Sequence, residues 1–489
     1  MLKEDMMKIN IKHSIKNTCI ILWGVFISVS VFSCVPTKAV REVNKTVPEG
    51  YQNQSADSLN TADVDWKTFF TDTNLTALID AALANNQELN MMLQQINMAK
   101  NEIKARKGEY LPFVNAYAGA EVEKVGEYTR NGAIEKNLNV HEEDAFPEPL
   151  QDYSIGLSAS WELDIWKKLR NGKKAAVFEY LSSVEGKNFM VTNLVAEIAN
   201  SYYELVALDN QLAIINKNLE LQQNALKMVK VQKQAARATE LAVRRFEAEV
   251  LKNQSNKYDI QQKIVEVENG INFLVGRYPQ HVVRNSDNFI NTNIDIINAG
   301  IPSQLLENRT DIRKAEFELS AAKLDTKVAK ANFYPAVGIS AGVGLQAFKP
   351  KFLTETPQSL VYSLVGDVVG PLINRNAIKA AYANANAKQL QTVYEYEKTV
   401  LNAYVEVANA LSSVENLKKS YDLRDKQVKA LNESIEIAMK LFKSARAEYT
   451  EVLLTQREAL DSQIEIIETK KEQLLAHVNV YKALGGGWK

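Results

Sequence analysis

The sequence has few of the residue types that build cross-links and reactive centres. Its two cysteines, Cys19 and Cys34, both lie near the start of 489 residues, so the rest of the chain can form neither an internal disulfide nor a thiolate metal site. The four histidines are too far apart in the sequence to suggest a metal pair. No glycine-rich phosphate loop and no nucleophile–base arrangement is found. We therefore predict no enzymatic activity, no metal site and no soluble cofactor.

The chain also lacks a strong net charge, and it has few glycines and prolines, the residues that interrupt helices and strands. Lysine and arginine total 58 against 59 aspartates and glutamates, so no global field favours nucleic acid, and none is expected as a partner. The 20 glycines and 11 prolines are few for this length. Their scarcity argues against many short strands and predicts long, uninterrupted elements.

Long apolar runs are absent except at the N-terminus. Three lysines, at 8, 12 and 16, precede an apolar run of 14 residues at 19–32, which is too short to span a membrane as a helix. Residues 1–33 are therefore predicted to be a lipoprotein signal peptide. Since no other stretch reaches transmembrane-helix length, we expect any membrane crossing to use a β-barrel.

The apolar run ends in Val31-Phe32-Ser33-Cys34, which resembles a bacterial lipobox. We expect Cys34 to become the lipidated first residue of the mature chain, and this covalent lipid is the only non-protein group predicted. Several acyl chains on one cysteine anchor a protein firmly. Residues 34–60 would then be an acylated, polar tether. The alternative is an ordinary signal peptide followed by an incidental cysteine.

The chain contains an internal duplication. Segment 86–112 matches 309–335, 170–176 matches 375–381, and 236–238 matches 445–447. The offsets are 223, 205 and 209 residues, so the first half carries 18 extra residues between the first two matches, and the second half four extra after them. Because insertions collect in loops, the offsets locate the loops. We predict repeats at 61–290 and 291–489.

Each half has the same expected order of elements. Apolar residues at helical spacing predict leading helices at 75–107 and 312–330, each ended by a proline. Alternating patterns then predict two strands per half, at about 113–122, 153–163, 337–345 and 360–369.

Long helices follow the strands in both halves. Segments 170–237 and 375–446 contain no proline, and each would be roughly 100 Å long as a helix. Return helices are expected at about 239–273 and 450–484. Leucine, isoleucine and valine recur every three or four residues, which predicts coiled-coil-like packing of two antiparallel hairpins. The apolar row in the first hairpin includes Leu205, Leu208, Leu212, Ile215 and Leu219.

The predicted fold class is mainly α with a β-barrel part. Four strands are too few to close a barrel and would leave exposed edges. Three copies would supply twelve strands, so the barrel reading predicts a homotrimer with a 12-stranded barrel. An ordinary soluble sheet is the alternative reading of the strand pattern.

Several motifs, in order along residues 60–489, give the chain a resemblance to a known family. They are 66–72 (WKTFFTD), 161–166 (WELDIW) followed by Lys168 and Arg170, 274–276 (LVG) with Pro279, 309–313 (RTDIR) with Ala315 and Glu316, and 484–488 (LGGGW). Together they resemble the TolC-like outer-membrane efflux proteins, in particular the lipoprotein channels of resistance-nodulation-division (RND) tripartite pumps. Thr310 stands where the family motif has proline, a change expected only to loosen the start of a helix.

The resemblance implies that the 12-stranded barrel lies in the outer membrane and that the helices form a periplasmic α-helical tunnel. It implies a passive outer-membrane duct that exports small molecules from the periplasm to the exterior. The implied partners are a periplasmic adaptor (membrane fusion protein), an inner-membrane RND pump, outer-membrane lipid and two further copies of the chain. The duct of a type I protein-secretion system and a non-channel periplasmic coiled coil are the alternatives. The first would be driven by an ATPase, and the second would form no barrel.

The expected functional residues lie at the tips of the helical hairpins, placed at 235–241 and 444–452. By resemblance the tips form the periplasmic entrance and contact the adaptor, and Glu451 is the acidic residue just inside that entrance. Arg237 and Arg446 could instead only cap helices, and Glu451 could be a solvated surface residue. The predicted adaptor-contact residues are Ala236, Arg237, Ala238, Thr239, Ala445, Arg446, Ala447 and Glu448.

Two other sets of residues could suggest cargo binding. Met91, Met92 and Met98 are interpreted as core packing rather than as copper ligands. The tyrosine pairs 202–203 and 394–396 are interpreted in the same way, as packing between helices.

Overall fold

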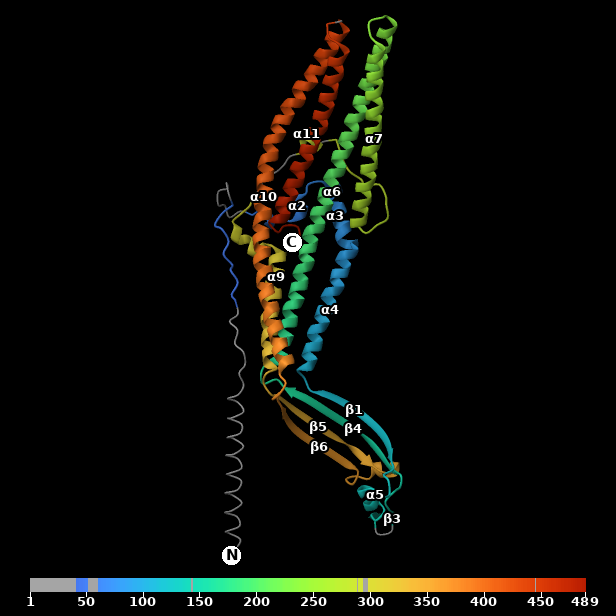
Figure 1. Cartoon of the computed structure of the whole chain (residues 1–489), viewed down its shortest axis with the longest axis vertical. Helices are drawn as coiled ribbons and strands as arrows, with labels where there is room; N and C mark the ends of the chain where they lie inside the picture. Colours follow the sequence, from blue (N-terminus) through green and yellow to red (C-terminus); the bar gives the residue numbers. More distant parts are fainter. Residues whose placement is uncertain (1–40, 52–59, 142–143, 288, 293–297, 445) are drawn as a thin grey trace. The chain divides into compact units, whose positions relative to one another are not determined.

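The computed structural model describes residues 41–51, 60–141, 144–287, 289–292, 298–444 and 446–489. The predicted signal peptide and Cys34 therefore lie outside the described residues, as does Ala445. The chain divides into two compact units (Figure 1). We call residues 98–180 and 318–393 the sheet unit, and residues 43–97, 181–317 and 394–489 the helical unit.

Four long helices form two hairpins. They are α6 (Lys168–Gln234), α7 (Glu240–Leu274), α10 (Asn376–Lys443) and α11 (Tyr449–Ala483). Both hairpins match the predicted long and return helices to within three residues at each end, since no proline interrupts them. In the helical unit, α6–α7 (green) and α10–α11 (orange to red) share apolar clusters, in which Leu460 of α11 packs with α6 and α7 (Figure 1).

The shorter helices precede the strands in each half. The first leading helix is split in two at Asn86, whose side chain accepts from the Leu89 amide at 2.9 Å and starts the second part. The helices before the strands are α3 (Thr73–Asn85), α4 (Gln87–Glu109) and α9 (Thr310–Ala331). Short helices in the segments before these are η1 (Thr61–Asp63), α2 (Trp66–Phe69), η2 (Phe289–Asn291), η3 (Pro302–Gln304) and α8 (Leu305–Asn308).

The sheet unit holds one four-stranded antiparallel sheet in the order β1-β4-β5-β6. Its strands are β1 (Phe113–Glu123), β4 (Leu150–Leu163), β5 (Ala336–Ala347) and β6 (Leu360–Val369). Each half contributes two strands, as predicted. The two halves join where β4 pairs with β5, with Leu163 opposite Val337. Strands β1 and β6 are the edges of the sheet, so within one chain their outer backbone groups have no strand partner.

The segment with the extra residues of the first half folds into small elements of its own. Between β1 and β4 lie helix α5 (Arg130–Glu135) and strands β2 (Asn139–His141) and β3 (Asp144–Ala145). The shorter β5–β6 connection holds only the 3₁₀ helix η4 (Pro350–Thr354). None of these elements was predicted, because each is too short to show a hydrophobic period.

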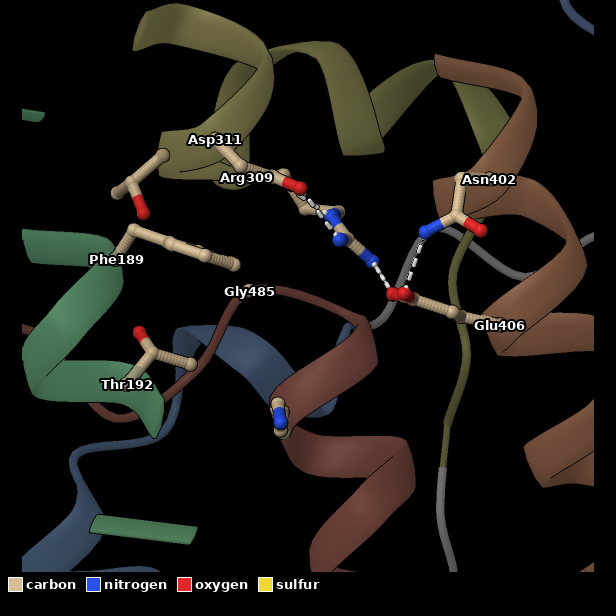
Figure 2. A pocket seen from close by; sticks show the side chains of 9 residues that line it. Phe189, Thr192, Arg309, Asp311, Asn402, Glu406 and Gly485 are labelled. Carbon is tan, nitrogen blue, oxygen red and sulfur yellow. Dashed lines mark hydrogen bonds and ion pairs between the residues drawn. The ribbon is translucent and has the colours of Figure 1, made fainter. Parts of the chain in front are cut away.

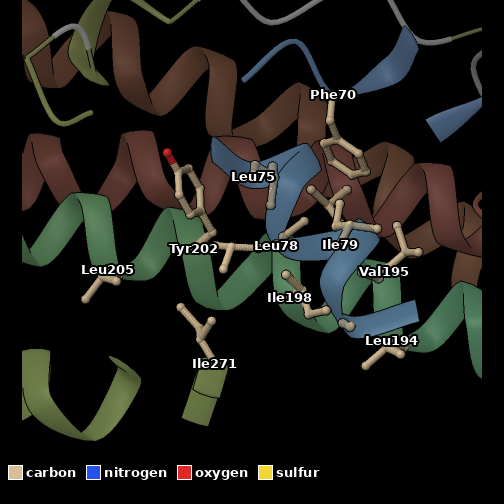
Figure 3. Packing of buried hydrophobic residues seen from close by; sticks show 14 of the residues in the cluster. Phe70, Leu75, Leu78, Ile79, Leu194, Val195, Ile198, Tyr202, Leu205 and Ile271 are labelled. Atoms are coloured by element: carbon tan, nitrogen blue, oxygen red, sulfur yellow. The ribbon is translucent and has the colours of Figure 1, made fainter. Parts of the chain in front are cut away.

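The largest apolar cluster of the helical unit lies between α3 and α6 (Figure 3). Leu75 and Ile79 of α3 are fully buried, as are Ile198 and Leu205 of α6. Burial of each such side chain contributes about 1.5–3 kcal/mol. Most of the predicted apolar row of α6 is buried, namely Leu205, Leu208, Ile215 and Leu219, whereas Leu212 is half-buried.

Part of the predicted tether packs against the helical unit. Tyr51 is 5% exposed, and its ring stacks on Tyr404 with centroids 5.5 Å apart. Lys45 forms an ion pair with Glu316 at 2.7 Å. Residues 43–51 of the predicted tether therefore contact the helical unit. Among the described residues, no helix combines the length and the apolar character that spanning a membrane requires.

Two packing interpretations need correction. Met91 and Met98 are 59% and 63% exposed, so within one chain they are not core residues. Tyr202 and Tyr396 are buried as expected, whereas Tyr394 is 56% exposed. Helical spacing alone did not show which face of each helix is covered.

Candidate functional site

The two hairpin tips are short loops between long helices. Residues 235–239 connect α6 to α7, and residues 444–448 connect α10 to α11. The predicted tips were too long, because Leu241 and Glu451 already lie in the first turns of the return helices. Glu451 is exposed there. Its repeat equivalent, Ala242, is fully buried, so the two tips differ at this position.

In the first tip, the end of α6 is closed by two backbone hydrogen bonds. The Arg237 amide donates to the Gln232 carbonyl at 2.8 Å, and the Ala236 amide donates to Lys233 at 2.9 Å. Ala236 has φ +58°, the left-handed conformation that such a helix end requires. Alanine adopts this conformation less readily than glycine, so the loop carries a small strain.

The start of α7 is fixed by side chains. Thr239 accepts a hydrogen bond from the Ala242 amide at 3.2 Å, which is an N-cap. Lys233 and Glu240 form an ion pair across the loop. The Lys233 hydrogen bond lowers the pKa of the Glu240 carboxyl, and the charges of Lys233 and Arg244 act in the same direction. We did not predict this pair, although its two members flank the tip at a spacing of seven residues.

The second tip repeats the backbone of the first but not its side-chain contacts. The Arg446 amide donates to Leu441 at 2.9 Å, which matches the Arg237 bond. Glu448 occupies the N-cap position of α11 without a side-chain capping bond. Its carboxylate instead accepts from the Thr450 hydroxyl at 3.3 Å. The first tip therefore has a side-chain N-cap at the start of its return helix, which the second tip lacks.

Beneath the tips lies an apolar cluster that includes side chains of both hairpins. Val229 and Phe246 are fully or almost fully buried, and Phe442 and Tyr449 of the second hairpin pack against them. Arg237 and Arg446 stay exposed above this cluster. Neither guanidinium has an ion pair or hydrogen bond to another described residue, so both are available to a partner.

At the base of the second hairpin, the buried Arg309 is the centre of an ionic network (Figure 2). It donates to both oxygens of Asp311, at 3.0 and 2.6 Å, and to Glu406 at 2.6 Å. It also donates to the Ala483 carbonyl at 3.0 Å. Burial alone lowers the pKa of Arg309, but the bonds and charges of Asp311 and Glu406 outweigh it and raise that pKa.

A cavity of about 130 Å³ adjoins this network and is also lined by Thr192 and Lys482. Arg309 and Asp311 belong to the sequence motif that carried the resemblance, whereas Glu406 was missed. It lies 97 residues away on α10, where no local pattern marks it. The network ties the start of α9 to the end of α11 and has no geometry for covalent chemistry. Within the described ranges, no three acidic, histidine or cysteine side chains are grouped to hold a metal ion.

Comparison with known proteins places this architecture among membrane channels. The family described as "Outer membrane efflux protein" matches residues 78–277 and 301–486. The chain is 26% identical over 462 residues to the "Pyoverdine export outer membrane protein OpmQ" of Pseudomonas aeruginosa, covering 94% of each chain. It is 25% identical over 448 residues to the "Cation efflux system protein CusC" of Escherichia coli K12, covering 90% of this chain and 93% of that one.

Solved structures show the same fold. A membrane protein of Pseudomonas aeruginosa superposes with a TM-score of 0.82 at 24% identity, covering 92% of this chain and 99% of the other. The open state of the MtrE outer membrane channel of Neisseria gonorrhoeae has a TM-score of 0.82 at 23% identity, covering 93% and 99%. The duplicated strand–hairpin arrangement is therefore shared with these proteins across nearly their whole length.

Proposed function

The chain belongs to the outer membrane efflux protein family, and from this premise we propose that three copies form the exit channel of a tripartite efflux pump. As a member of this family, the chain is an outer-membrane efflux channel protein rather than an enzyme. The proposal concerns its assembly, its anchor and its entrance. The observation that carries it is the four-stranded sheet with two open edges, fused to two long helical hairpins.

The sheet supports the assembly of three copies. Both edge strands, β1 and β6, lack an outer partner within the chain. If β6 of one copy pairs with β1 of the next, every edge is satisfied, and twelve strands close a barrel. All 11 residues of β1 are exposed in the single chain, which fits a wall with lipid on one side and water on the other.

The tips support a periplasmic entrance that docks an adaptor. Arg237 and Arg446 are exposed, without partners among the described residues, and they stand on a fixed backbone. Such cations suit carboxylates on a partner protein. The remaining predicted contact residues, from Ala236 to Thr239 and from Ala445 to Glu448, belong to the same two loops. An inner-membrane RND pump would supply the energy, because the channel has no nucleotide-binding motif.

The anchor is proposed to be a lipid on Cys34, in the periplasm-facing leaflet of the outer membrane. The lipobox-like residues support this, and the ordered contacts of 43–51 would limit the reach of the tether. A relative with 24% identity over 428 residues, from Salmonella typhimurium, is named "Probable outer membrane lipoprotein SilC". Labelling with radioactive palmitate is expected to disappear in Cys34→Ser, and retained labelling would contradict the assignment.

The cargo is proposed to be a class of small molecules chosen by the pump. Relatives are named for the export of pyoverdine, cations and toluene. One channel fold thus serves chemically different compounds, which fits a passive duct.

Glu451 provides the test of the entrance. In a trimer, three copies of this exposed carboxylate would form an anionic ring that favours cations. We expect Glu451→Gln to move the reversal potential of a reconstituted channel toward zero across a salt gradient. Glu240→Gln, which removes a carboxylate from the other tip, is the matched control and should leave it unchanged. An identical reversal potential in wild type and Glu451→Gln would contradict the ring.

A further inference from the structure

One end of the sheet holds a cavity that the channel function does not use. Strand β4 ends at Leu163, next to the start of β5, and Ala336 at that start pairs with Val369 at the end of β6. The turns that connect these strands to helices therefore lie together in the sheet unit. A cavity of about 310 Å³ lies among them, large enough for a small polar headgroup.

One wall of this cavity is aromatic and rigid. The rings of Trp166 and Tyr334 stack with centroids 4.6 Å apart and planes 20° apart. The Trp166 indole donates to the Pro335 carbonyl at 2.7 Å, which fixes its orientation. Tryptophan and tyrosine are enriched where a membrane meets water, because their rings are apolar and their polar atoms can bond.

The mouth of the cavity carries charges of both signs. Glu162 and Lys168 form an ion pair at 2.5 Å, with side chains 37% and 29% exposed. Lys167 is exposed beside them, and its ammonium has no ion pair or hydrogen bond to another described residue. Its φ of +59° is a left-handed conformation that is unfavourable for lysine. The nearby Asp164 side chain is 1% exposed, and its two oxygens accept hydrogen bonds from the Leu169 amide and from Arg170, so Glu162 is the accessible carboxylate.

Exposed apolar side chains lie at the cavity and in the chain that leaves it. Ile165 lines the cavity and is 54% exposed, and Leu372 and Ile373, which directly follow the lining residue Pro371, are 77% and 90% exposed. Three exposed aliphatic side chains in these two turns favour an apolar partner. Acyl chains would cover them without requiring any further polar contacts.

We propose that this cavity binds the headgroup of a phospholipid with an ethanolamine head. The lipid ammonium would pair with Glu162, and its phosphate with Lys168 and Lys167. The acyl chains would lie on Ile165, Leu372 and Ile373. This inference rests on the proposed function, which places the helix-bearing end of the sheet at the periplasmic surface of the outer membrane.

The test uses the full-length, delipidated protein in detergent, titrated with phosphatidylethanolamine, phosphatidylcholine or phosphatidylglycerol and measured by native mass spectrometry. We expect phosphatidylethanolamine to bind most tightly. The trimethylated ammonium of phosphatidylcholine cannot donate hydrogen bonds, and the glycerol head of phosphatidylglycerol carries no positive charge. Glu162→Gln should weaken phosphatidylethanolamine binding about tenfold, the loss of one charge-assisted hydrogen bond. Lys168→Gln is a second variant that should also weaken it.

The control is Glu148→Gln, at the opposite end of the sheet. Glu148 pairs with Lys124 at 3.3 Å and both are exposed, so the change removes the same charge from a similar pair. Equal lipid binding by Glu162→Gln and Glu148→Gln would overturn the proposal. Equal affinity of wild type for all three lipids, or no bound lipid, would overturn it as well. Channel conductance is measured in parallel, and its absence in wild type would contradict the proposed function instead.

Discussion

The two halves of the chain build the same junction at the base of each helical hairpin. In both, the return helix ends on a glycine in the left-handed region, Gly276 at φ +75° and Gly485 at φ +93°. A Cβ at Gly276 would lie 2.6 Å from the Asn85 carbonyl oxygen, and one at Gly485 would lie 2.7 Å from that of Asn308. The backbone of the junction has therefore been kept in both repeats.

The side chains that bind the end of each return helix are different. In the first half the Asn86 amide donates to the Leu274 carbonyl at 2.8 Å. In the second half Arg309, at the matching position, donates to Ala483 and also pairs with Glu406. One junction is thus neutral and the other ionic. The duplication preserved the backbone geometry, while the stabilising chemistry diverged.

The largest expected effect comes from breaking the ionic junction. Arg309→Ala would remove the buried guanidinium that binds half-buried Asp311, exposed Glu406 and the Ala483 carbonyl, at a cost of about 2–3 kcal/mol. Asn86→Ala should cost about 1–2 kcal/mol, since it removes one helix cap and one neutral hydrogen bond. Denaturant unfolding in detergent measures both.

Arg106→Ala is the control, because Arg106 makes comparable ion pairs with Glu102 and Glu109 but is 44% exposed. It should cost less than about 1 kcal/mol. Equal losses for Arg309→Ala and Asn86→Ala would show that the ionic network adds nothing to the junction.

Alanine at the two left-handed glycines should have the next largest effect, and a similar one in both halves. Gly276→Ala and Gly485→Ala each force a Cβ against a carbonyl oxygen, at a cost of about 1–3 kcal/mol. Gly270→Ala is the control within α7, where a Cβ meets nothing within 4 Å. That variant should gain up to about 1 kcal/mol. An unchanged free energy of unfolding in Gly485→Ala would contradict the claim that both junctions require a left-handed glycine.

The tips repeat the contrast on a smaller scale. Thr239→Ala removes an N-cap and should destabilise the start of α7 by about 1 kcal/mol. Glu448→Ala should change the start of α11 less, because Glu448 makes no capping bond. Hydrogen exchange of the amides in each first turn reports both. A larger increase in amide exchange for Glu448→Ala than for Thr239→Ala would contradict the prediction that the Thr239 cap matters more.

The smallest effect concerns the Lys233–Glu240 pair. Because the pKa of Glu240 is lowered in the folded chain, its contribution is present above the ordinary glutamate pKa and is lost as the pH falls through the lowered value. Exchange at the Arg237 amide should therefore be less protected below about pH 4 than at pH 7, after correction for intrinsic rates. Lys233→Gln should abolish this pH dependence, and its persistence would assign the effect to another group.

Much of the fold follows from periodicity and from the repeat. The absence of proline predicted both long hairpins, and alternation predicted all four strands of the sheet. The offset of 209 residues also predicted the tip loops, because insertions avoid packed helices. These features are local, or are repeated within the chain.

What could not be predicted depends on contacts between distant segments. The pairing of β4 with β5, the approach of Glu406 to Arg309 and the packing of Tyr51 on Tyr404 leave no local pattern. The exposure of Met91 also depends on which neighbours cover a helix face. The lipid anchor at Cys34 remains a prediction, since that residue lies outside the described ranges.

The central claim is that three chains share one channel. The most direct test is the protein mass of the mature, detergent-purified chain, measured by multi-angle light scattering with the detergent contribution removed. The account predicts the mass of three chains, with each sheet edge paired to a neighbour. A stable species with the mass of one chain would contradict it, because the edges of β1 and β6 would then remain open.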